Sequence, residues 1–320
     1  MVYPVSTSPY AGANPNPAYS GVFIPTLWSG KLIEKFYDAT VLGAIANTDY
    51  EGEIRNQGDT VKIRTKPSIT INDYEANQAL AVERPSRPTV ELQINRGKYW
   101  NTVLDDVMEV QSDLDLLSMW ADDASEQMKI VIDTDVLTNI SPDIVAANKG
   151  ASAGRISGNI DLGATGSPLS VVARNAGTGE VEVTDAIIRM GQVLDEQNIP
   201  ETGRWLIVPA WFLSQIKRSE LRDASLAGDS VSISRNGRVG MIDRFTLYLS
   251  NLLPQVTDST DTVYRIFAGH SHGLTFASQL TNVETLRAES TFGTLMRGLQ
   301  VYGHKVIDGT ALAELYALQG

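Results

Sequence analysis

The residues of this chain best suited to chemistry are its histidines. Two of the three, His270 and His272, stand two positions apart, and in a strand that spacing would place both imidazoles on one face. Such a pair can bind a metal ion when a third ligand is near. The neighbouring sequence offers no such ligand, so the pattern favours a turn or surface role and predicts no metal site.

Carboxylates occur in pairs at three places. The pairs are Asp105 with Asp106, Asp122 with Asp123, and Asp133 with Asp135. General acid–base catalysis requires two carboxylates in different environments within one cleft. All three pairs lie beside or on the polar side of an expected helix. A solvated helix face is therefore favoured over an acidic-residue hydrolase.

Motifs typical of nucleotide-binding enzymes are absent from the sequence. The chain has no Gly-x-Gly-x-x-Gly and no phosphate-binding loop. Ser271 lies between two histidines, but no acid or oxyanion hole is expected near it. Without cysteine there is no thiolate nucleophile, disulfide or cysteine-based metal site. The sequence predicts no enzyme activity, no catalytic residue and no cofactor.

The charge balance argues against a protein that reads nucleic acid. The chain has 38 acidic and 26 basic residues, for a formal net charge of -12. Phosphate binding depends on clustered Lys and Arg. The basic clusters are small, namely Arg235 with Arg238, and Lys217 and Arg218 with Arg222, and ion pairs at subunit contacts explain them better. An acidic protein can still enclose nucleic acid without gripping it, as a container wall would.

Neither a signal peptide nor a membrane span is predicted. Residues 1–20 have no basic start and no apolar run, and residues 1–27 are expected to form a flexible or strand-exchanging arm. No stretch approaches the ~18 apolar residues needed to span a bilayer. No membrane partner is expected.

The elements that position these residues are mixed helices and strands without regular alternation, which indicates an α+β fold. An apolar stripe from Val107 to Val131 predicts a helix over Asp113 to Asn139, roughly 40 Å long at 1.5 Å per residue. Shorter helices are expected within 28–46, after a Thr184 cap, and over Trp211 to Arg218. Strands are expected at Trp205–Val208, Phe245–Leu249, Thr262–Ala268, within Phe292–Ile307 and at Leu312–Leu318.

A long two-stranded arm is predicted between Gly58 and Tyr99. Thr60–Arg64 and Val90–Ile94 alternate apolar and polar residues, while Pro67–Pro88 between them is too long for a tight hairpin turn. The arm either folds back on its own domain or lies on a neighbouring subunit. In the second case the expected contact residues are Lys62, Arg64, Ile69, Ile71, Tyr74, Leu80 and Arg84.

Short runs in a particular order carry a resemblance. They are Val41–Ile45, Tyr50–Ile54 and Gly58–Val61; then Trp205–Pro209, Gly237–Ile242 and Ser250–Pro254; and finally Phe292-Gly293, Leu299, Tyr302-Gly303 and Lys305-Val306. With these runs, over Val22 to Leu318, the chain resembles the major capsid proteins of tailed double-stranded DNA bacteriophages, which share the Hong Kong 97 type fold.

The resemblance implies an architecture and a role. An N-terminal arm (1–27) would precede the first part of a peripheral domain (28–57), an extended loop lying on a neighbour (58–99) and the peripheral domain with its spine helix (100–145). A Gly/Ser-rich loop or small insertion (146–183), an axial domain (184–285) and a C-terminal return (286–320) would follow. Such subunits would assemble in the host cytoplasm, as hexamers and pentamers of an icosahedral virion shell around double-stranded DNA.

Two departures from the family limit what the resemblance implies. Some relatives carry a long N-terminal scaffolding segment, whereas about twenty residues precede Val22 here. We therefore expect a separate scaffolding protein, beside a portal protein and, as an option, a decoration protein. Some relatives crosslink through a loop lysine, but no lysine lies between Lys66 and Lys98, so no crosslink through the arm tip is expected. An encapsulin-like compartment shell of the same fold is the alternative function.

Overall fold

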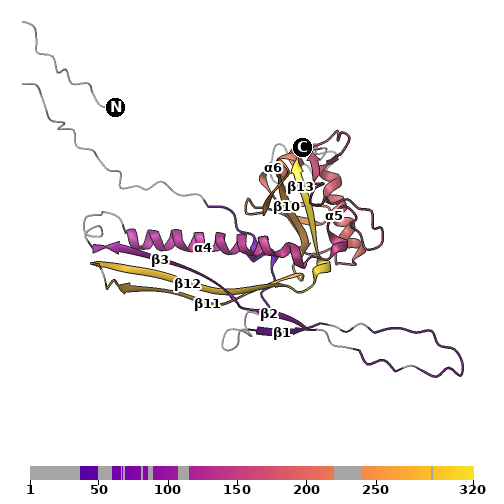
Figure 1. Cartoon of the computed structure of the whole chain (residues 1–320), viewed down its shortest axis with the longest axis horizontal. Coiled ribbons are helices and arrows are strands. Elements are labelled where there is room, and N and C mark those ends of the chain that lie inside the picture. Colours follow the sequence, from indigo (N-terminus) through magenta and orange to yellow (C-terminus); the bar gives the residue numbers. More distant parts are fainter. Residues whose placement is uncertain are drawn as a thin grey trace, which may run out of the picture. The chain divides into compact units, whose positions relative to one another are not determined.

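The computed structural model describes residues 37–49, 60–65, 67, 69–80, 82–85, 89–106, 115–219, 240–289 and 291–320. These residues form sheets of two, three and eight strands, together with two helices of more than ten residues (Figure 1). Several predictions fall outside the described residues: the N-terminal arm, residues 28–36 of the segment 28–46 in which short helices were expected, and the bases Arg222, Arg235 and Arg238.

The eight-stranded sheet forms the centre of the larger core. Its order is β5-β4-β13-β10-β6-β8-β7, with β9 paired to β10, and the pairs β13–β4, β4–β5 and β6–β8 are parallel. Its strands are β4 (Leu169–Val172), β5 (Glu180–Glu182), β6 (Arg204–Val208), β7 (Met241–Ile242), β8 (Phe245–Leu249), β9 (Gln255–Asp258), β10 (Asp261–His270) and β13 (Leu312–Gln319). All five residues of β6 are buried, which explains why its sequence is a continuous apolar run.

Two helices pack on this sheet. Helix α5 (Val183–Glu196) contacts β4, β5 and β13, and also contacts α6 (Ala210–Arg218). The expected helix over Trp211 to Arg218 and the strands at Trp205–Val208 and Phe245–Leu249 are confirmed. The expected cap at Thr184 is wrong, because α5 begins at Val183 and Thr184 is its second residue; the residue before the helix, Glu182, makes no side-chain cap.

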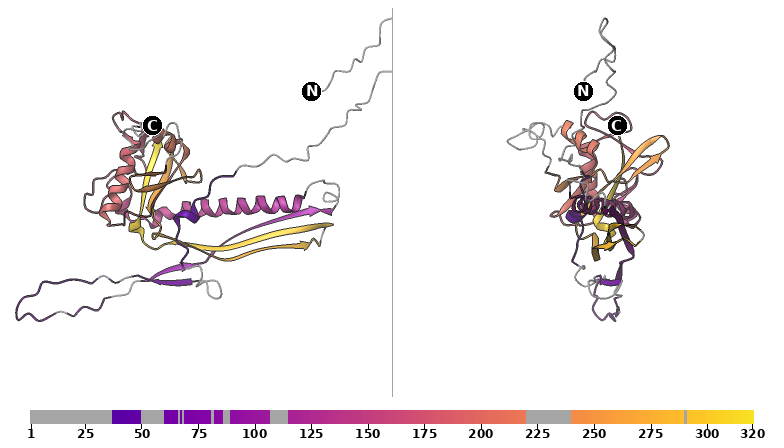
Figure 2. Two further views of the ribbon diagram at one scale, coloured as in Figure 1. Left: turned by 180° about the vertical axis from the view of Figure 1, so that it is seen from behind. Right: turned by 90° about the vertical axis from the view of Figure 1, so that its left-hand side faces the viewer.

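The three-stranded sheet supports the longest helix. Its order is β11-β12-β3, antiparallel throughout, with β3 at Arg96–Asp105, β11 at Leu274–Arg287 and β12 at Gly293–Val306. Helix α4 (Leu116–Ile140) contacts β3 and β12, and the views in Figure 2 agree that it runs along these strands. The sequence predicted neither β3 nor β11. Residues 274–285, expected in the axial domain, therefore pair in the three-stranded sheet.

The buried face of α4 differs from the predicted stripe. The predicted stripe ends at Val131, which is 43% exposed, whereas Ile132, Val136 and Leu137 are buried. The helix was expected from Asp113 to Asn139, and Asp113 lies outside the described residues. Only the last third of α4 enters the larger core, so the apolar spacing of the earlier residues indicated the helix but not its buried face.

Residues 146–183 contribute to the core. They contain β4 and β5, and the buried Ile160 and Leu162 belong to the same cluster as β6 and β13. Their short apolar segments are separated by glycines, which is why the sequence indicated a loop or small insertion. The remaining short helices are α1 (Leu42–Ile45), η1 (Ser141–Asp143), η2 (Ala146–Asn148) and η4 (Gly309–Ala311).

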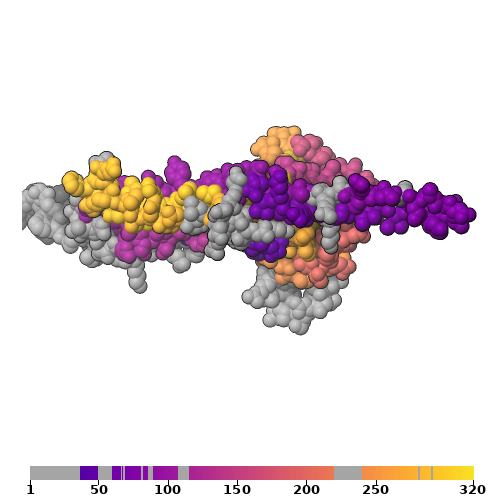
Figure 3. Space-filling model, turned by 90° about the horizontal axis from the view of Figure 1, so that it is seen from below, coloured from indigo at the N-terminus to yellow at the C-terminus, as the bar shows by residue number. Residues whose placement is uncertain are grey.

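The arm begins with the two-stranded sheet of β1 (Thr60–Arg64) and β2 (Thr89–Gln93). In the space-filling view, the arm residues beyond these strands form a narrow strip (Figure 3). Among the described residues, none of the helices combines the length and apolar character that crossing a bilayer requires.

Candidate subunit-contact surface

The arm keeps one hairpin register from its base toward its tip. At the end of the β1–β2 ladder, Arg64 lies opposite Thr89. Six residues further out on each strand, the N–H of Thr70 donates to the carboxylate of Glu83 at 3.1 Å. The two halves of the arm therefore keep the β1–β2 register at that point.

A tight turn closes the arm five residues beyond Thr70. The N–H of Gln78 donates to the carbonyl of Glu75 at 3.1 Å, and the N–H of Glu75 donates to the side-chain oxygen of Gln78 at 3.0 Å. Asn77, inside the turn, has a φ of 69°, a conformation that asparagine tolerates. The connection between β1 and β2 is long, as expected, and it closes only at its far end, in this turn.

The ladder itself does not continue beyond β1 and β2. Among the described residues between Arg64 and Thr89, none is assigned to a strand. Pro67 and Pro85 have no N–H to donate, so they interrupt any ladder in this register. The middle of the arm thus holds its register without the backbone pairing that would complete it.

One face of the arm carries apolar side chains at its base and again toward its tip. In an antiparallel ribbon, opposite residues share a face, and every second residue along each strand returns to it. With the register above, that face carries Val61, Ile63, Val90 and Leu92 at the base and Ile69, Ile71, Leu80 and Val82 toward the tip. Ile63 and Leu92 are buried, whereas Ile71 is 89% exposed and Val82 is 91% exposed.

The base of the arm packs on its own chain. Ile63, Leu92 and Ile94 form a small buried cluster with Ala277 of β11, and Val301 of β12 packs against it. Of the two alternatives left open by the sequence, folding back is correct for the base. The tip residues of the same face are exposed, so they remain available to another molecule.

The structure groups the seven predicted contact residues into two sets. Ile69, Ile71, Leu80 and Arg84 share the apolar face by register, whereas Lys62, Arg64 and Tyr74 lie on the other face. Lys62 forms an ion pair with Glu91 at 3.2 Å, with both side chains largely exposed, and such pairs stabilise a fold only slightly. Val82 was missed, although its alternation with Leu80 across Ala81 indicates the same face.

A charged junction ties the exit of the arm to α4. Asp135 of α4 accepts hydrogen bonds from Arg96, the first residue of β3, at 2.6 Å and from Tyr302 of β12 at 2.7 Å. Burial opposes the charge on Asp135, but the bonds from Tyr302 and Arg96 outweigh it and lower the pKa of this carboxyl. Burial, together with the hydrogen bond to Asp135, raises the pKa of Tyr302. The pair Asp133–Asp135 is therefore not a solvated face.

The nearby Asp133 is buried and accepts a hydrogen bond from the main chain. The carboxylate accepts a hydrogen bond from the N–H of Val41 at 2.7 Å, just before α1. Burial raises the pKa of Asp133, and the bonded N–H partly opposes this effect. The expectation of a solvated face is correct for Asp122 and Asp105, which are exposed, and wrong for Asp133 and Asp135, because α4 is covered by α1 and by β12 at these positions.

His304 lies beside the same junction. Burial, together with the positive charge of Arg96, lowers the pKa of His304 to about 4. Its Nδ1 is buried without a hydrogen-bond partner among the described residues. This imidazole is therefore neutral near pH 7 in the folded chain.

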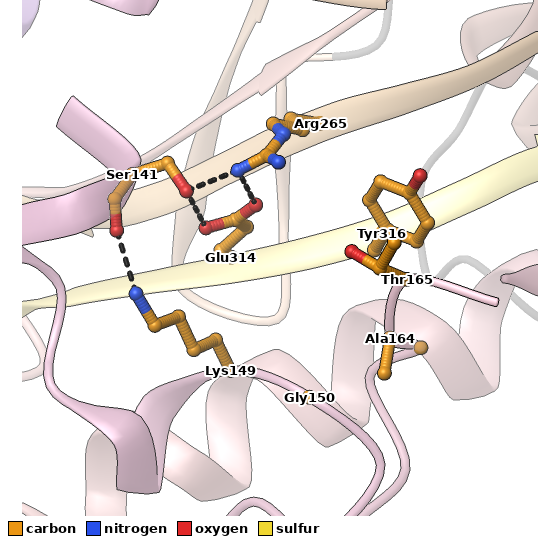
Figure 4. A pocket seen from close by; sticks show the side chains of 9 residues that line it. Ser141, Lys149, Gly150, Ala164, Thr165, Arg265, Glu314 and Tyr316 are labelled. Atoms are coloured by element: carbon orange, nitrogen blue, oxygen red, sulfur yellow. Dashed lines mark hydrogen bonds and ion pairs between the residues drawn. The ribbon is translucent and has the colours of Figure 1, made fainter. Parts of the chain in front are cut away.

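A second polar network joins the end of α4 to the eight-stranded sheet (Figure 4). The hydroxyl of Ser141 donates to Glu314 of β13 at 2.6 Å and accepts from Arg265 of β10, which pairs with Glu314 at 3.0 Å. Lys149 donates to the main-chain carbonyl of Ser141 at 2.7 Å. The cavity beside these groups has a volume of about 270 Å³. Because Lys149 binds the carbonyl and not the hydroxyl, the group fastens elements together and is not a serine–lysine pair.

The histidine pair forms a turn, as expected. Strand β10 ends at His270, whose Nδ1 accepts a hydrogen bond from the N–H of His272 at 3.1 Å. The two imidazoles therefore do not share a strand face. Within the described part of the chain, no three side chains of metal-binding type lie together.

Comparison with known proteins supports a shell subunit. The family model for phage capsid proteins matches residues 96–315, more than half of the chain. A solved structure from Mycobacterium phage Che8 is 25% identical, with a TM-score of 0.73, covering 93% of this chain and 98% of that one. A search among curated proteins finds no match.

More distant solved structures share the fold. The capsid of cyanophage P-SCSP1u is 15% identical over 93% of this chain and 94% of its own, with a TM-score of 0.69. The capsid of a native GTA particle is 13% identical over 93% and 97%, with a TM-score of 0.66. These comparisons do not favour the encapsulin-like alternative. The chain belongs to the phage capsid protein family, has the Hong Kong 97 type fold, and is a major capsid protein of the virion.

Proposed function

We propose that this capsid protein assembles into hexamers and pentamers of an icosahedral shell that encloses double-stranded DNA. The observation that carries the proposal is the apolar face of the arm, whose tip residues Ile71 and Val82 are almost fully exposed. Contiguous exposed apolar side chains mark surfaces that bind other proteins. Several relatives of the same fold were solved as capsids, which supports a second copy of this chain as the partner.

The arm tip is the clasp between subunits in this proposal. Ile69, Ile71, Leu80 and Val82 are buried against the neighbour, with Arg84 beside them. Lys62, Arg64 and Tyr74 contribute polar and aromatic contacts from the other face. Because the sequence has no lysine between Lys66 and Lys98, the tip holds its neighbour without a covalent bond.

The remaining parts keep the roles that the family resemblance implies. Residues 28–57 and 100–145 form the peripheral domain, residues 184–273 with the segment before them form the axial domain, and residues 274–320 return first to the peripheral domain and then to the axial domain. The protein acts by geometry and not by catalysis. Separate scaffolding and portal proteins, with a decoration protein as an option, complete a particle that assembles in the host cytoplasm.

A deletion designed on the register tests the clasp. Residues 69 and 84 lie opposite each other, so replacing Ile69–Arg84 by Asn-Gly shortens the arm without shifting β1 against β2. We expect a folded subunit that fails to build stable shells, measured by circular dichroism and by sedimentation. Normal shells from the shortened chain would refute the proposal.

A further inference from the structure

A basic pocket lies at one end of the eight-stranded sheet. It has a volume of about 530 Å³ and is lined by Arg174, Gln215, Lys217 and Arg218. Val172 and Gln319, at the carboxyl ends of the parallel strands β4 and β13, also line it. In open sheets flanked by helices, ligands bind most often beyond the carboxyl ends of strands.

The long polar side chains of this pocket make no side-chain hydrogen bond or ion pair within the described part of the chain. Gln215 is 5% exposed, and its amide is not among the buried groups that lack solvent. Arg174, Lys217 and Arg218 form no ion pair with a described residue. Lys217 and Arg218 stand in the last turn of α6, where cations stabilise a helix, but this does not explain why Arg174 converges on them from another element.

An acidic pocket lies at the opposite end of β4. It has a volume of about 510 Å³ and is lined by Asp161, Glu180, Asp185 and Arg189, and by Leu169, the first residue of β4. Asp185 pairs with Arg189 at 2.8 Å. Three carboxylates against one guanidinium leave this pocket with an excess of negative charge.

We propose that the basic pocket of one subunit binds the acidic pocket of the next copy, head to tail, through the exposed arginines Arg174 and Arg218 at its rim. This inference rests on the proposed shell function. Contact between two different surfaces of one chain is heterologous, and repeated heterologous contacts form a ring when the rotation from one copy to the next closes on itself. In a chain of net charge -12, complementary patches orient copies that otherwise repel each other.

The chemistry favours carboxylates over nucleic acid as the occupant. Arginine binds carboxylates through two parallel hydrogen bonds. Among the described residues, three cations line the pocket, which is a small footprint for a phosphate backbone, whereas the chain itself supplies a matching acidic pocket. The pairing determines which flank of one axial domain meets which flank of the next.

A charge exchange tests the pairing. Lys217→Glu with Arg218→Glu should raise the protein concentration needed for assembly at least about tenfold, and so should Glu180→Lys with Asp185→Lys. The chain with all four changes keeps the net charge of -12, since two cations are lost and two gained. It should assemble like the unmodified chain, measured by sedimentation, with circular dichroism and Tm as the test of folding.

Each contrary outcome is informative. Assembly of either double variant at the unmodified concentration overturns the pairing, and so does a folded fourfold variant that stays defective. Normal shells of Lys217→Glu with Arg218→Glu that fail to retain DNA would instead assign the basic pocket to DNA. Failure of the unmodified chain to form shells would refute the proposed function itself.

A smaller exchange covers the case in which a variant fails to fold. The carboxylate of Glu180 accepts a hydrogen bond from the N–H of Gly177, so its substitution can disturb that loop. Arg218→Glu and Asp185→Lys, alone and combined, then repeat the test at two exposed positions. Loss in each single variant with recovery in the pair supports the pairing, and no recovery overturns it.

Discussion

Truncating the arm tip should weaken the shell and leave the subunit intact. Ile71→Ala removes three carbon atoms and Val82→Ala removes two, each worth about 0.8 kcal/mol when buried. Together they correspond to about 4 kcal/mol per subunit for side chains fully buried in the shell, or roughly a thousandfold rise in the concentration at which shells form. In the isolated chain both side chains are about nine-tenths exposed, so the free energy of unfolding should change by less than about 0.5 kcal/mol.

Sedimentation over a series of protein concentrations measures the first quantity, and urea unfolding of the unassembled subunit measures the second. Ile156→Ala is the matched control, because this side chain is 76% exposed and lies outside the arm. An unchanged assembly concentration for the double variant would refute burial of the tip in the shell. A loss of several kcal/mol in the unassembled subunit would show instead that the tip packs on its own chain.

Three further predictions concern the junction and the arm. His304 has a pKa of about 4 in the folded chain, below that of the unfolded chain near 6.5. As the pH falls, the unfolded state therefore takes up the proton first, and the contribution of His304 to the free energy of unfolding in urea should fall by about 3 kcal/mol from pH 7 to pH 4. His304→Phe should remove this contribution. Tyr302→Phe removes a hydrogen bond to the charged Asp135 and should cost about 1.5–3 kcal/mol in urea unfolding at pH 7, whereas a change below 0.5 kcal/mol would contradict the role of the junction. Boiling purified shells in detergent should release monomers, and a ladder of covalent oligomers would contradict a noncovalent contact between subunits.

The sequence predicted the elements whose burial produces a local apolar pattern. Strand β6 is buried on both faces and reads as a continuous apolar run, and α6 follows it after Pro209. Strand β3 was missed because only Leu104 of its ten residues is buried, so its sequence shows no apolar alternation. Strand β11 was missed because its pairing with β12 is a tertiary contact that no local pattern reveals.

The candidate contact surface was predictable where a local apolar pattern marks it and not where it depends on tertiary contacts. Alternating apolar residues identified the arm, and of the eight apolar residues on its apolar face the sequence missed Val82 alone. The register that unites them depends on Thr70, Glu83 and the turn at Glu75–Gln78. The burial of Asp133 and Asp135 was not predictable, since α1 and β12, which cover them, are distant in sequence. From their charge alone, Asp133 and Asp135 were expected to face solvent, whereas in the fold both carboxylates have hydrogen-bond partners.

Electron microscopy of purified particles, at a resolution that traces the arm, shows where each arm tip lies in the shell. We expect closed shells in which the apolar face of each arm tip, at Ile71 and Val82, is buried against a neighbouring subunit. Shells whose arm tips lie on their own subunit, or remain free in solvent, would contradict this expectation.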